Sequence, residues 1–321
     1  MLNDPVLIND WHVVAYAPDL PENKPVGVSL LDEDIVLWKA NGTIHAWRDL
    51  CLHRGTRLSL GRVEDCTIIC PYHGWQYNAE GQCIRFPAHP DQKPPKTARV
   101  QVYRAAERYG WVWVTPGEPD HDIALFPQWG NPAFQIVHCG PYQMNASGPR
   151  AVENFLDVTH FPFVHQGLLG DPAHPDVNDY TAEISADGVV ARDISVWQPD
   201  PDGTGKGARV NYTYKVLRPL TAYFEKSSQG PQFAMYFTIT PVSQASSIVW
   251  MYVAMDYGDL TDEEVRHFQD VIIKQDIPIV ESQRPELLPL DLQAELHLRS
   301  DRTAIAYRKW LRDLGVTFGT A

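Results

Sequence analysis

The sequence predicts an α+β protein in which a small antiparallel β-domain is followed by a larger domain with an antiparallel sheet flanked by helices. Three observations support this. Short strand-like runs separated by Gly- and Pro-containing turns fill the first third, a longer β-rich section follows a connecting stretch, and a well-capped helical pattern lies near the end. We expect a first domain over residues 1–118, a connection over 119–143 and a second domain over 144–321.

The first domain has the pattern of a small sheet with functional residues at its loop tips. Strand-like runs, joined by turns at Asn41-Gly42 and Gly81, cover residues 35–38, 44–47, 75–77, 83–86 and 110–115. An Asn-Gly pair between two such runs is a strong signal for a β-hairpin.

The second domain combines long strands with a helix. Residues 233–240 and 248–255 have the pattern of paired antiparallel strands, and Asp187-Gly188 joins two further strand-like runs. Thr261 is followed by Glu264 three residues later, which predicts a capping box and a helix start. Along this helix apolar residues recur at helical spacing, and we expect Pro278 to disturb it near its end. The expected apolar positions are Val265, Phe268, Ile272 and Ile279.

Two cysteine–histidine pairs lie close together in the first domain. Cys51 and His53 form a C-x-H pair, Cys70 and His73 form a C-x2-H pair, and sixteen residues separate the pairs. In a Rieske-type [2Fe–2S] cluster two histidines replace two cysteines on one of the irons. The spacing therefore predicts such a cluster, with Cys51 and Cys70 on one iron and His53 and His73 on the other.

Two other interpretations of this motif are less favoured. A structural zinc site also uses two cysteines and two histidines, but it usually groups the cysteines before the histidines. A disulfide between Cys51 and Cys70 would leave both histidines unexplained. The remaining Cys66, Cys83 and Cys139 are odd in number, which disfavours a disulfide framework and favours a reducing compartment.

A second group of polar residues occurs in the otherwise apolar segment 152–166. Asn154, Asp157 and His160 are three residues apart, so a helix would place them on one face. His165 follows five residues after His160. Two histidines with nearby carboxylates suggest a metal site, and a helix whose polar residues have other partners is the alternative.

A carboxylate from the C-terminal helix completes this set. Asp276 lies next to the apolar stripe, where an unpaired carboxylate is costly. His160, His165 and Asp276 together make the two-histidine, one-carboxylate set of non-haem Fe(II) oxygenases. Asp270 and Glu281 are alternative carboxylates on the same helix.

The charge and the segment pattern exclude several classes of partner. The formal net charge is −13, whereas nucleic-acid binding needs a basic face. Neither a signal-peptide pattern nor an apolar run of about eighteen residues is visible. We therefore expect a cytoplasmic protein with neither nucleic-acid nor membrane partners.

Together the two motifs resemble those of the α-subunit of Rieske non-haem iron aromatic-ring-hydroxylating oxygenases. CLH and CPYHGW match the family's cluster motif, and ENFLDVTHFPFVH matches its mononuclear-iron motif, N-x2-D-x2-H-x4-H. The length and the run QDIPIVESQ resemble the α-only branch that contains vanillate and dicamba demethylases and phthalate oxygenases. The closing run SDRTAIAYRKWLRDLGVTFG is most similar to the saxitoxin-tailoring hydroxylases of that branch.

The resemblance implies roles for the domains and residues. Residues 1–118 become the Rieske domain and 144–321 the catalytic domain, and Asp276 becomes the third iron ligand. Head-to-tail homotrimers of the family bring the cluster of one subunit to the iron of its neighbour. Asp157 then bridges His73 of one subunit to the iron-bound histidine of the next.

The resemblance also implies a reaction. It is the reductive activation of O2 with electrons from a separate NAD(P)H-dependent reductase or ferredoxin, since the chain has no G-x-G-x-x-G turn. We expect a monooxygenase of aromatic hydrocarbon catabolism that hydroxylates or oxidatively demethylates an aromatic, heterocyclic or polycyclic small molecule. Asn154 is expected to take part beside the iron, as a hydrogen-bonding partner of a ligand or of water. The alternatives are ring cis-dihydroxylation, a Rieske electron carrier without catalysis, and a zinc-bound scaffold protein.

Overall fold

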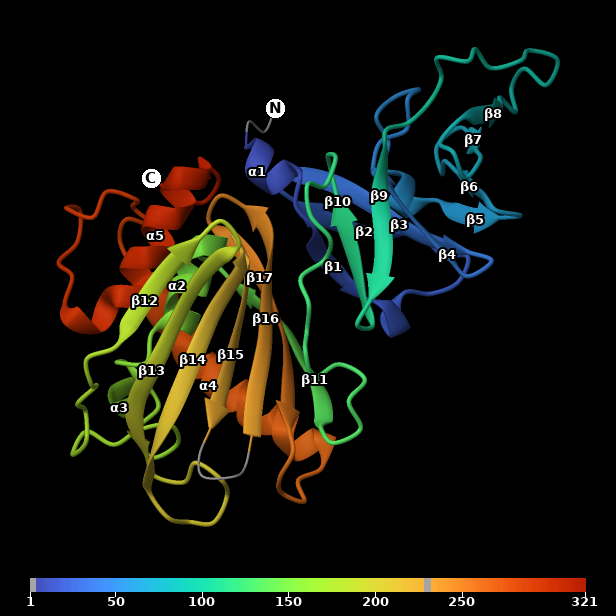
Figure 1. Cartoon of the computed structure of the whole chain (residues 1–321). Coiled ribbons are helices and arrows are strands. Elements are labelled where there is room, and N and C mark those ends of the chain that lie inside the picture. The colour runs from blue at the N-terminus through green and yellow to red at the C-terminus, as the bar shows by residue number, and fades with distance from the viewer. Residues whose placement is uncertain (1–3, 228–231) are drawn as a thin grey trace. The chain divides into compact units, whose positions relative to one another are not determined.

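The computed structural model describes residues 4–227 and 232–321. The chain divides into two compact units, Met1–Ile123 and Ala124–Ala321 (Figure 1). Every strand pair in both units is antiparallel, and helices accompany the larger sheet, so the predicted α+β class is confirmed. None of the helices in the described ranges is both long and apolar enough to span a bilayer.

The first unit contains a six-stranded and a four-stranded sheet. In spatial order the six-stranded sheet consists of β1 (His12–Tyr16), β10 (Trp111–Thr115), β9 (Val102–Arg108), β4 (Thr43–Arg48), β3 (Glu33–Ala40) and β2 (Val26–Leu30). The four-stranded sheet consists of β5 (Arg62–Glu64), β6 (Thr67–Ile69), β7 (Gln76–Tyr77) and β8 (Cys83–Arg85). Short helices are α1 (Pro5–Ile8), η1 (Ala17–Asp19) and η2 (Leu58–Leu60). Asn41 and Gly42 turn β3 into β4 at φ 51° and 75°, which confirms the predicted hairpin.

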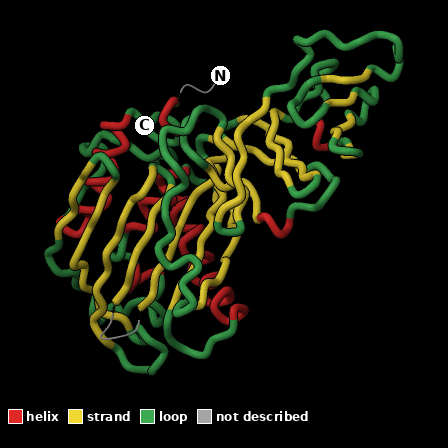
Figure 2. The backbone as a smooth tube through the Cα atoms, turned by 45° about the vertical axis from the view of Figure 1, so that its right-hand side comes forward, coloured by secondary structure: helices red, strands yellow, loops and turns green. Residues whose placement is uncertain are grey.

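The second unit is a seven-stranded sheet with helices on one face (Figures 1 and 2). In spatial order its strands are β11 (Gln135–Met144), β17 (Ser246–Met255), β16 (Gln232–Ser243), β15 (Thr221–Ser227), β14 (Ala208–Arg218), β13 (Gly188–Gln198) and β12 (Thr181–Ser185). The helices are α2 (Gly148–Leu156), α3 (Phe161–Val164), α4 (Asp262–Ser282), η3 (Arg299–Asp301) and α5 (Arg302–Leu314). In contacts between elements, α4 packs on β11, α2 on β16 and β17, and α5 on β12 and β13.

Most of the expected connection 119–143 belongs to the second unit. From Gln135 onward it forms β11, the edge strand that pairs with β17. Gly140 and Pro141 interrupt the alternation of inward- and outward-facing residues at the register shift between Cys139 and Tyr142. Because Gly and Pro are typical of loops, the sequence of this strand resembles that of a loop.

The segment expected to be one helix is broken into two. α2 ends at Leu156, Asp157 is its C-terminal cap, and α3 begins only after His160. The expectation that Asn154, Asp157 and His160 share a helix face is therefore wrong. Asp157 and His160 still meet, because the turn between the helices keeps their side chains close.

The helix predicted from Thr261 forms with its capping box, but it runs through Pro278 to Ser282. Its buried residues are Val265, Gln269, Ile273, Asp276 and Val280. Phe268 and Ile279 are more than a third exposed, so the expected stripe was rotated by about one position. The corrected face is a regular helical stripe that includes two polar residues.

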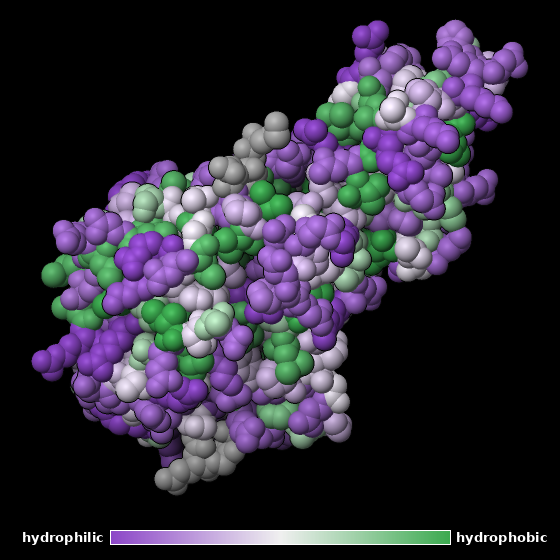
Figure 3. Space-filling view, turned by 45° about the horizontal axis from the view of Figure 1, so that its top comes forward, coloured by the Kyte–Doolittle hydropathy of each residue, from purple (hydrophilic) through white to green (hydrophobic). Residues whose placement is uncertain are grey.

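Hydrophilic side chains cover most of the face drawn in Figure 3, and hydrophobic ones form small separate groups. Scattered exposed hydrophobic residues are normal for a globular protein. The functional residues are instead found in the loops of the first unit and between the sheet and helices of the second.

Candidate functional site

The first set of predicted residues lies on two loops with the same backbone design. The N–H of Gly55 donates to the carbonyl of Cys51 at 2.9 Å, and the N–H of Gly74 donates to the carbonyl of Cys70 at 3.1 Å. Both glycines have positive φ, +70° and +67°, a conformation that other residues adopt only with strain. In each loop the glycine of the C-x3-G pattern therefore allows the backbone to turn back onto the carbonyl of the cysteine.

The histidines of these loops lie against each other. The ring centroids of His53 and His73 are 4.4 Å apart, and His53 stacks on Trp75 at 4.5 Å. Nδ1 of His53 is buried and has no hydrogen-bond partner among the described residues, as fits a nitrogen that binds a metal. His73 is exposed, so its ring is accessible from outside.

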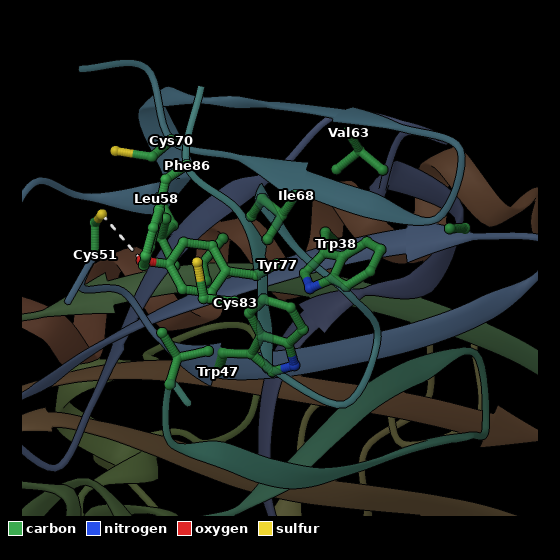
Figure 4. Packing of buried hydrophobic residues seen from close by; sticks show 13 residues of the cluster. Trp38, Trp47, Cys51, Leu58, Val63, Ile68, Cys70, Tyr77, Cys83 and Phe86 are labelled. Carbon is green, nitrogen blue, oxygen red and sulfur yellow. Dashed lines mark hydrogen bonds between the residues drawn. The ribbon is translucent and has the colours of Figure 1, made fainter. Parts of the chain in front are cut away.

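Both cysteine sulfurs lie at the same side of a packed apolar cluster (Figure 4). The hydroxyl of Tyr77 lies 3.2 Å from Sγ of Cys51, and the N–H of Leu52 donates to the same hydroxyl oxygen at 3.3 Å. A thiolate that binds a metal has no proton to donate, so the hydroxyl of Tyr77 would be the donor to Cys51 once a cluster is bound. The sequence pattern alone does not single out this tyrosine, although it follows His73 by only four residues.

The four residues do not form a single-ion site. Four ligands around one zinc ion lie within about 4 Å of one another. Among the described residues, no three of Cys51, His53, Cys70 and His73 offer ligand atoms that all lie within 4.8 Å of one another, whereas another group of three residues does. A two-iron cluster holds its ligands farther apart, so the arrangement favours the cluster over zinc.

That other group is His160, His165 and Asp276. Nε2 of His160 lies 3.2 Å from Nε2 of His165, and Oδ1 of Asp276 lies 3.1 Å from Nε2 of His165 and 3.4 Å from Nε2 of His160. Two ligand atoms about 2.1 Å from one ion and at right angles stand about 3 Å apart. The three atoms thus form one triangular face of a metal coordination sphere.

The carboxylate oxygen of this triangle also lacks a hydrogen-bond partner among the described residues. Oδ1 of Asp276 is buried and makes no well-aligned hydrogen bond among the described residues, although both imidazoles are near. A buried carboxylate oxygen without a partner is costly. A divalent cation among the three atoms removes that cost, so the residues fit a mononuclear iron.

Neighbouring groups orient both imidazoles. Nδ1 of His160 lies 3.3 Å from Oδ2 of Asp157, and Nδ1 of His165 lies 2.8 Å from Oε1 of Gln275. An acceptor at Nδ1 fixes the proton there and leaves Nε2 free for a metal. Oδ1 of Asp157 in turn accepts from the N–H and hydroxyl of Thr159 at 2.7 Å and 2.6 Å.

The same contacts set the ionisation of the metal-free site. Burial lowers the pKa of His160, but Asp157 and Asp276 outweigh it and raise the pKa to about 9. Burial raises the pKa of Asp276, but the imidazoles of His160 and His165 outweigh it and hold the pKa below its ordinary value. The carboxylate is therefore already ionised, and a metal that binds here displaces a proton from His160.

A cavity of about 510 Å³ opens beside the three donor atoms, between the sheet and α4. Its wall is mainly aromatic and aliphatic, as in sites for small organic ligands. The aromatic residues that line it are Phe155, Phe161, Tyr212, Tyr214, Phe224, Phe233, Phe237, Tyr257 and Phe268. Polar residues such as Gln198 and Lys226, which the sequence did not reveal as site residues, line it too.

The remaining predicted residues are also placed. Asn154 lines the cavity from α2. The two alternative carboxylates are engaged elsewhere, because Asp270 accepts from the hydroxyl of Tyr142 at 2.7 Å and Glu281 from the N–H of Asn145 at 2.7 Å. Both therefore hold α4 to β11 and its continuation.

A buried ion-pair cluster fixes α2, the helix that leads into this site. Arg308, which is 2% exposed, donates to both carboxylate oxygens of Glu153 at 2.5 Å and 2.7 Å and to Glu295 at 2.5 Å. Such two-pronged contacts add directional specificity. The cluster joins α5 to the residue next to Asn154.

Comparison with known proteins adds independent information. Residues 10–104 match the model of the Rieske [2Fe-2S] domain, and residues 144–316 match that of the vanillate O-demethylase oxygenase C-terminal domain. Methylxanthine N1-demethylase NdmA of Pseudomonas putida is 31% identical over 316 residues, which cover 95% of this chain and 88% of that protein.

Two further similarities concern a solved structure and an oxidoreductase. The solved structure of Pseudomonas putida NdmA with caffeine superposes with a TM-score of 0.84 at 30% identity, over 96% of this chain and 90% of that one. Oxidoreductase NdmD of Pseudomonas putida is 38% identical over 114 residues, which are 35% of this chain and 19% of that protein.

Proposed function

This chain belongs to the Rieske oxygenases with a vanillate O-demethylase-type catalytic domain, and we propose that it oxidatively demethylates or hydroxylates a small aromatic or heterocyclic molecule. The family's members carry a Rieske [2Fe–2S] cluster and a mononuclear non-haem iron. The relative NdmA is a methylxanthine N1-demethylase, which supports removal of a methyl group as the reaction.

One observation carries the proposal, the triangle of two imidazole nitrogens and one carboxylate oxygen beside a cavity of about 510 Å³. We infer that His160, His165 and Asp276 hold the mononuclear iron and that Cys51, Cys70, His53 and His73 hold the cluster. When bound, the cluster supplies single electrons and the iron supplies a site for reductive activation of O2.

The chain's own residues prepare this site. Asp157 and Gln275 hold the two imidazoles with Nε2 turned inward. The aromatic wall excludes water from the substrate and holds its ring, while Asn154 offers a hydrogen bond at the edge of the cavity. A Rieske electron carrier has no need of such a cavity, which disfavours that alternative.

We further infer a homotrimer in which electrons pass between subunits. Asp157 is in contact with His160 through one oxygen, and its side chain is 35% exposed. His73 is exposed on its loop. A carboxylate that reaches both the iron-site histidine and the surface is suited to accept a hydrogen bond from His73 of a neighbouring subunit, as the bridge between the two metal sites.

The electron source is proposed to be a separate NAD(P)H-dependent reductase or ferredoxin. The similarity to oxidoreductase NdmD covers 35% of this chain and 19% of that protein, which supports a partner that shares a related module. We place the protein in the cytoplasm, because none of the five cysteines forms a disulfide, which suits a reducing compartment.

The test is turnover by the anaerobically reconstituted protein with NADH and a surrogate reductase. Methoxybenzoates and methylxanthines are offered separately, and formaldehyde, O2 consumption and product mass are measured. Formaldehyde released in step with O2 uptake supports demethylation. A diol product carrying both oxygen atoms indicates ring dihydroxylation instead, and reduction of the cluster with no product from any aromatic supports an electron carrier.

A further inference from the structure

A buried arginine of the C-terminal helix α5 reaches α2, the helix that Asp157 caps. Arg308 is 2% exposed, and its guanidinium donates to both carboxylate oxygens of Glu153 on α2, at 2.5 Å and 2.7 Å. It also donates to the carbonyl of Pro289 at 3.1 Å. A two-pronged contact fixes the direction of the carboxylate as well as its distance, so the contact restricts how α2 can rotate.

The pair belongs to the ion-pair cluster, which also contains Arg150 and Glu295. Glu295 accepts from Arg308 at 2.5 Å and from Arg150 at 2.8 Å. Nη1 of Arg150 in turn lies 3.6 Å from Glu153. The formal charges of these four side chains cancel, and loss of one member would leave a buried charge without its partner. The four side chains therefore act as one unit.

The ion-pair cluster joins both long elements that carry residues of the proposed iron site. Arg150 and Glu153 belong to α2, which ends at the cap residue Asp157. Arg150 also donates to the carbonyl of Pro285 at 2.9 Å, shortly after the end of α4, the helix that carries Asp276. The ion-pair cluster therefore fixes the position of α2 relative to that of α4.

The last turn of α2 places two residues at the site. Asn154, which directly follows Glu153, lines the cavity. The N–H of Asp157 donates to the carbonyl of Asn154 at 3.1 Å. Oδ2 of Asp157 lies 3.3 Å from Nδ1 of His160, which is at the long end of hydrogen-bond distances. A small rotation of α2 is therefore enough to break the contact between the carboxylate and the imidazole.

α5 also supports the surroundings of Asp157 from its first turn. The N–H and hydroxyl of Thr303 donate to the hydroxyl oxygen of Tyr180 at 3.2 Å and 3.1 Å, and this hydroxyl donates to the carbonyl of Ser300 at 2.5 Å. Burial raises the pKa of Tyr180, the contacts from Thr303 oppose this, and the charge of Asp157 adds to the rise. The phenol is therefore within electrostatic reach of the carboxylate, so α5 acts on the surroundings of Asp157 at two places.

We propose that Arg308 is a positioning residue of the iron site. Through Glu153 it sets the rotation of α2 and so holds the carboxylate of Asp157 at Nδ1 of His160. Arg308 is not among the described residues that line the cavity, so it acts only through its partners. The proposal rests on the function proposed above, in which His160 binds iron and Asp157 bridges the metal sites. Loss of the contact should change the ligand geometry at the iron and slow turnover per bound iron.

The variants separate position from stability. Arg308→Met removes the two-pronged contact, and Arg308→Lys keeps the charge but not the planar geometry. Glu153→Leu combined with Arg308→Met removes one charge of each sign, so that no buried charge is left without a partner. The matched control is Arg312→Met, an exposed arginine of the same helix whose ion-pair partner is its neighbour Asp313. The [2Fe–2S] spectrum and the melting temperature check that each variant is folded.

Two measurements report the position of Asp157. Hydrogen exchange of residues 157–160, in the full chain before mononuclear iron is added, follows the turn, because the N–H of Thr159 donates to Oδ1 of Asp157. The EPR spectrum of the nitric oxide adduct of the anaerobic, iron-loaded holoenzyme reports the ligand geometry around the iron. A residue that only stabilised the fold would change the melting temperature but not this spectrum. The kcat per bound iron is measured alongside with methylxanthines and methoxybenzoates.

We expect Arg308→Met to raise the exchange of residues 157–160 about tenfold or more, to change the adduct spectrum and to lower kcat per bound iron about 10- to 100-fold. Arg308→Lys gives smaller changes and Arg312→Met gives none. The double variant regains melting temperature but neither the wild-type exchange nor the wild-type spectrum. Unchanged exchange and spectrum in Arg308→Met, or recovery of both in the double variant, overturns the proposal. If the wild-type protein binds no mononuclear iron, the proposed function fails, and hydrogen exchange still decides whether Arg308 positions the turn.

Discussion

Nδ1 of His165 lies 2.8 Å from Oε1 of Gln275 on α4. The next residue of this helix is Asp276, whose carboxylate lies beside Nε2 of the same histidine. One helix therefore supplies both a proposed iron ligand and the group that orients another. We predict that Gln275→Leu lowers the affinity for mononuclear iron about 10- to 100-fold, because the imidazole loses the acceptor that fixes its tautomer. Iron content after dialysis against a chelator measures this. Lys274→Ala, an exposed neighbour on the same helix, is the control, and equal iron retention in both variants would refute the role.

Asp276→Ala is expected to lose the mononuclear iron and to keep the cluster spectrum. The substitution removes one corner of the donor triangle and leaves two histidines, too few for stable binding. Iron and acid-labile sulfide are quantified together with the visible spectrum. Asp270→Asn and Glu281→Gln serve as controls, since these carboxylates bind Tyr142 and Asn145 instead. Normal iron content in Asp276→Ala would move the ligand to another residue.

Asp157→Asn is expected to keep both metals but to abolish turnover, because the bridge loses its charge while its size is retained. Burial raises the pKa of Asp157, but His160 and Thr159 outweigh it, so the native bridge is ionised at neutral pH. Steady-state O2 uptake with reductase is compared with metal content. Glu183→Gln, on the exposed edge strand β12, is the control. Activity near that of the wild type would exclude the relay.

Tyr77→Phe is expected to lower the reduction potential of the cluster. A hydrogen bond to Cys51 Sγ stabilises the more negative reduced state, and the substitution removes only the hydroxyl. Protein-film voltammetry gives the potential directly. Tyr103→Phe, in β9 of the same unit, should leave it unchanged. A potential that does not move would mean that the hydroxyl has another partner once the cluster is bound.

Lys226 gives a pH-dependent prediction. Its folded pKa of about 8 is below the ordinary value of 10.5, so the unfolded chain holds the proton more strongly between these pH values. The free energy of unfolding therefore rises with pH across this window, relative to Lys226→Met, and is flat below it. Urea denaturation of both proteins at pH 7 and pH 9.5 measures the difference. A difference that falls or stays constant would show that the ammonium is not desolvated.

The sequence was most informative where a residue's chemistry is unusual for its surroundings. Cysteines and histidines at fixed spacing in one segment, and histidines among apolar residues in another, predicted both metal sites. The fold class followed from turn signals such as Asn41-Gly42, because a two-residue turn depends only on local backbone preferences.

What the sequence did not reveal depends on contacts between distant segments. Gln275 is an ordinary polar residue of a helix until α3 places His165 beside it. Lys226 has the pattern of a surface lysine on a strand, but its ammonium donates to the carbonyl of Pro201 and lies over the ring of Phe233, contacts that the sequence does not show. The end of α2 at Leu156 was missed because helix spacing alone does not show where a capping residue stops the helix.

α4 carries Asp276 and also much of the cavity wall, through Val265, Phe268, Gln269 and Ile273. Iron and substrate therefore share one rigid support, and their binding free energies are linked. By thermodynamic reciprocity, any compound that binds the iron-loaded form more tightly than the iron-free form must raise the affinity for iron by the same factor. The fraction of iron that the protein retains at equilibrium with a chelator thus becomes a reporter of cavity occupancy, and compounds that raise this fraction identify themselves as ligands even when they never react.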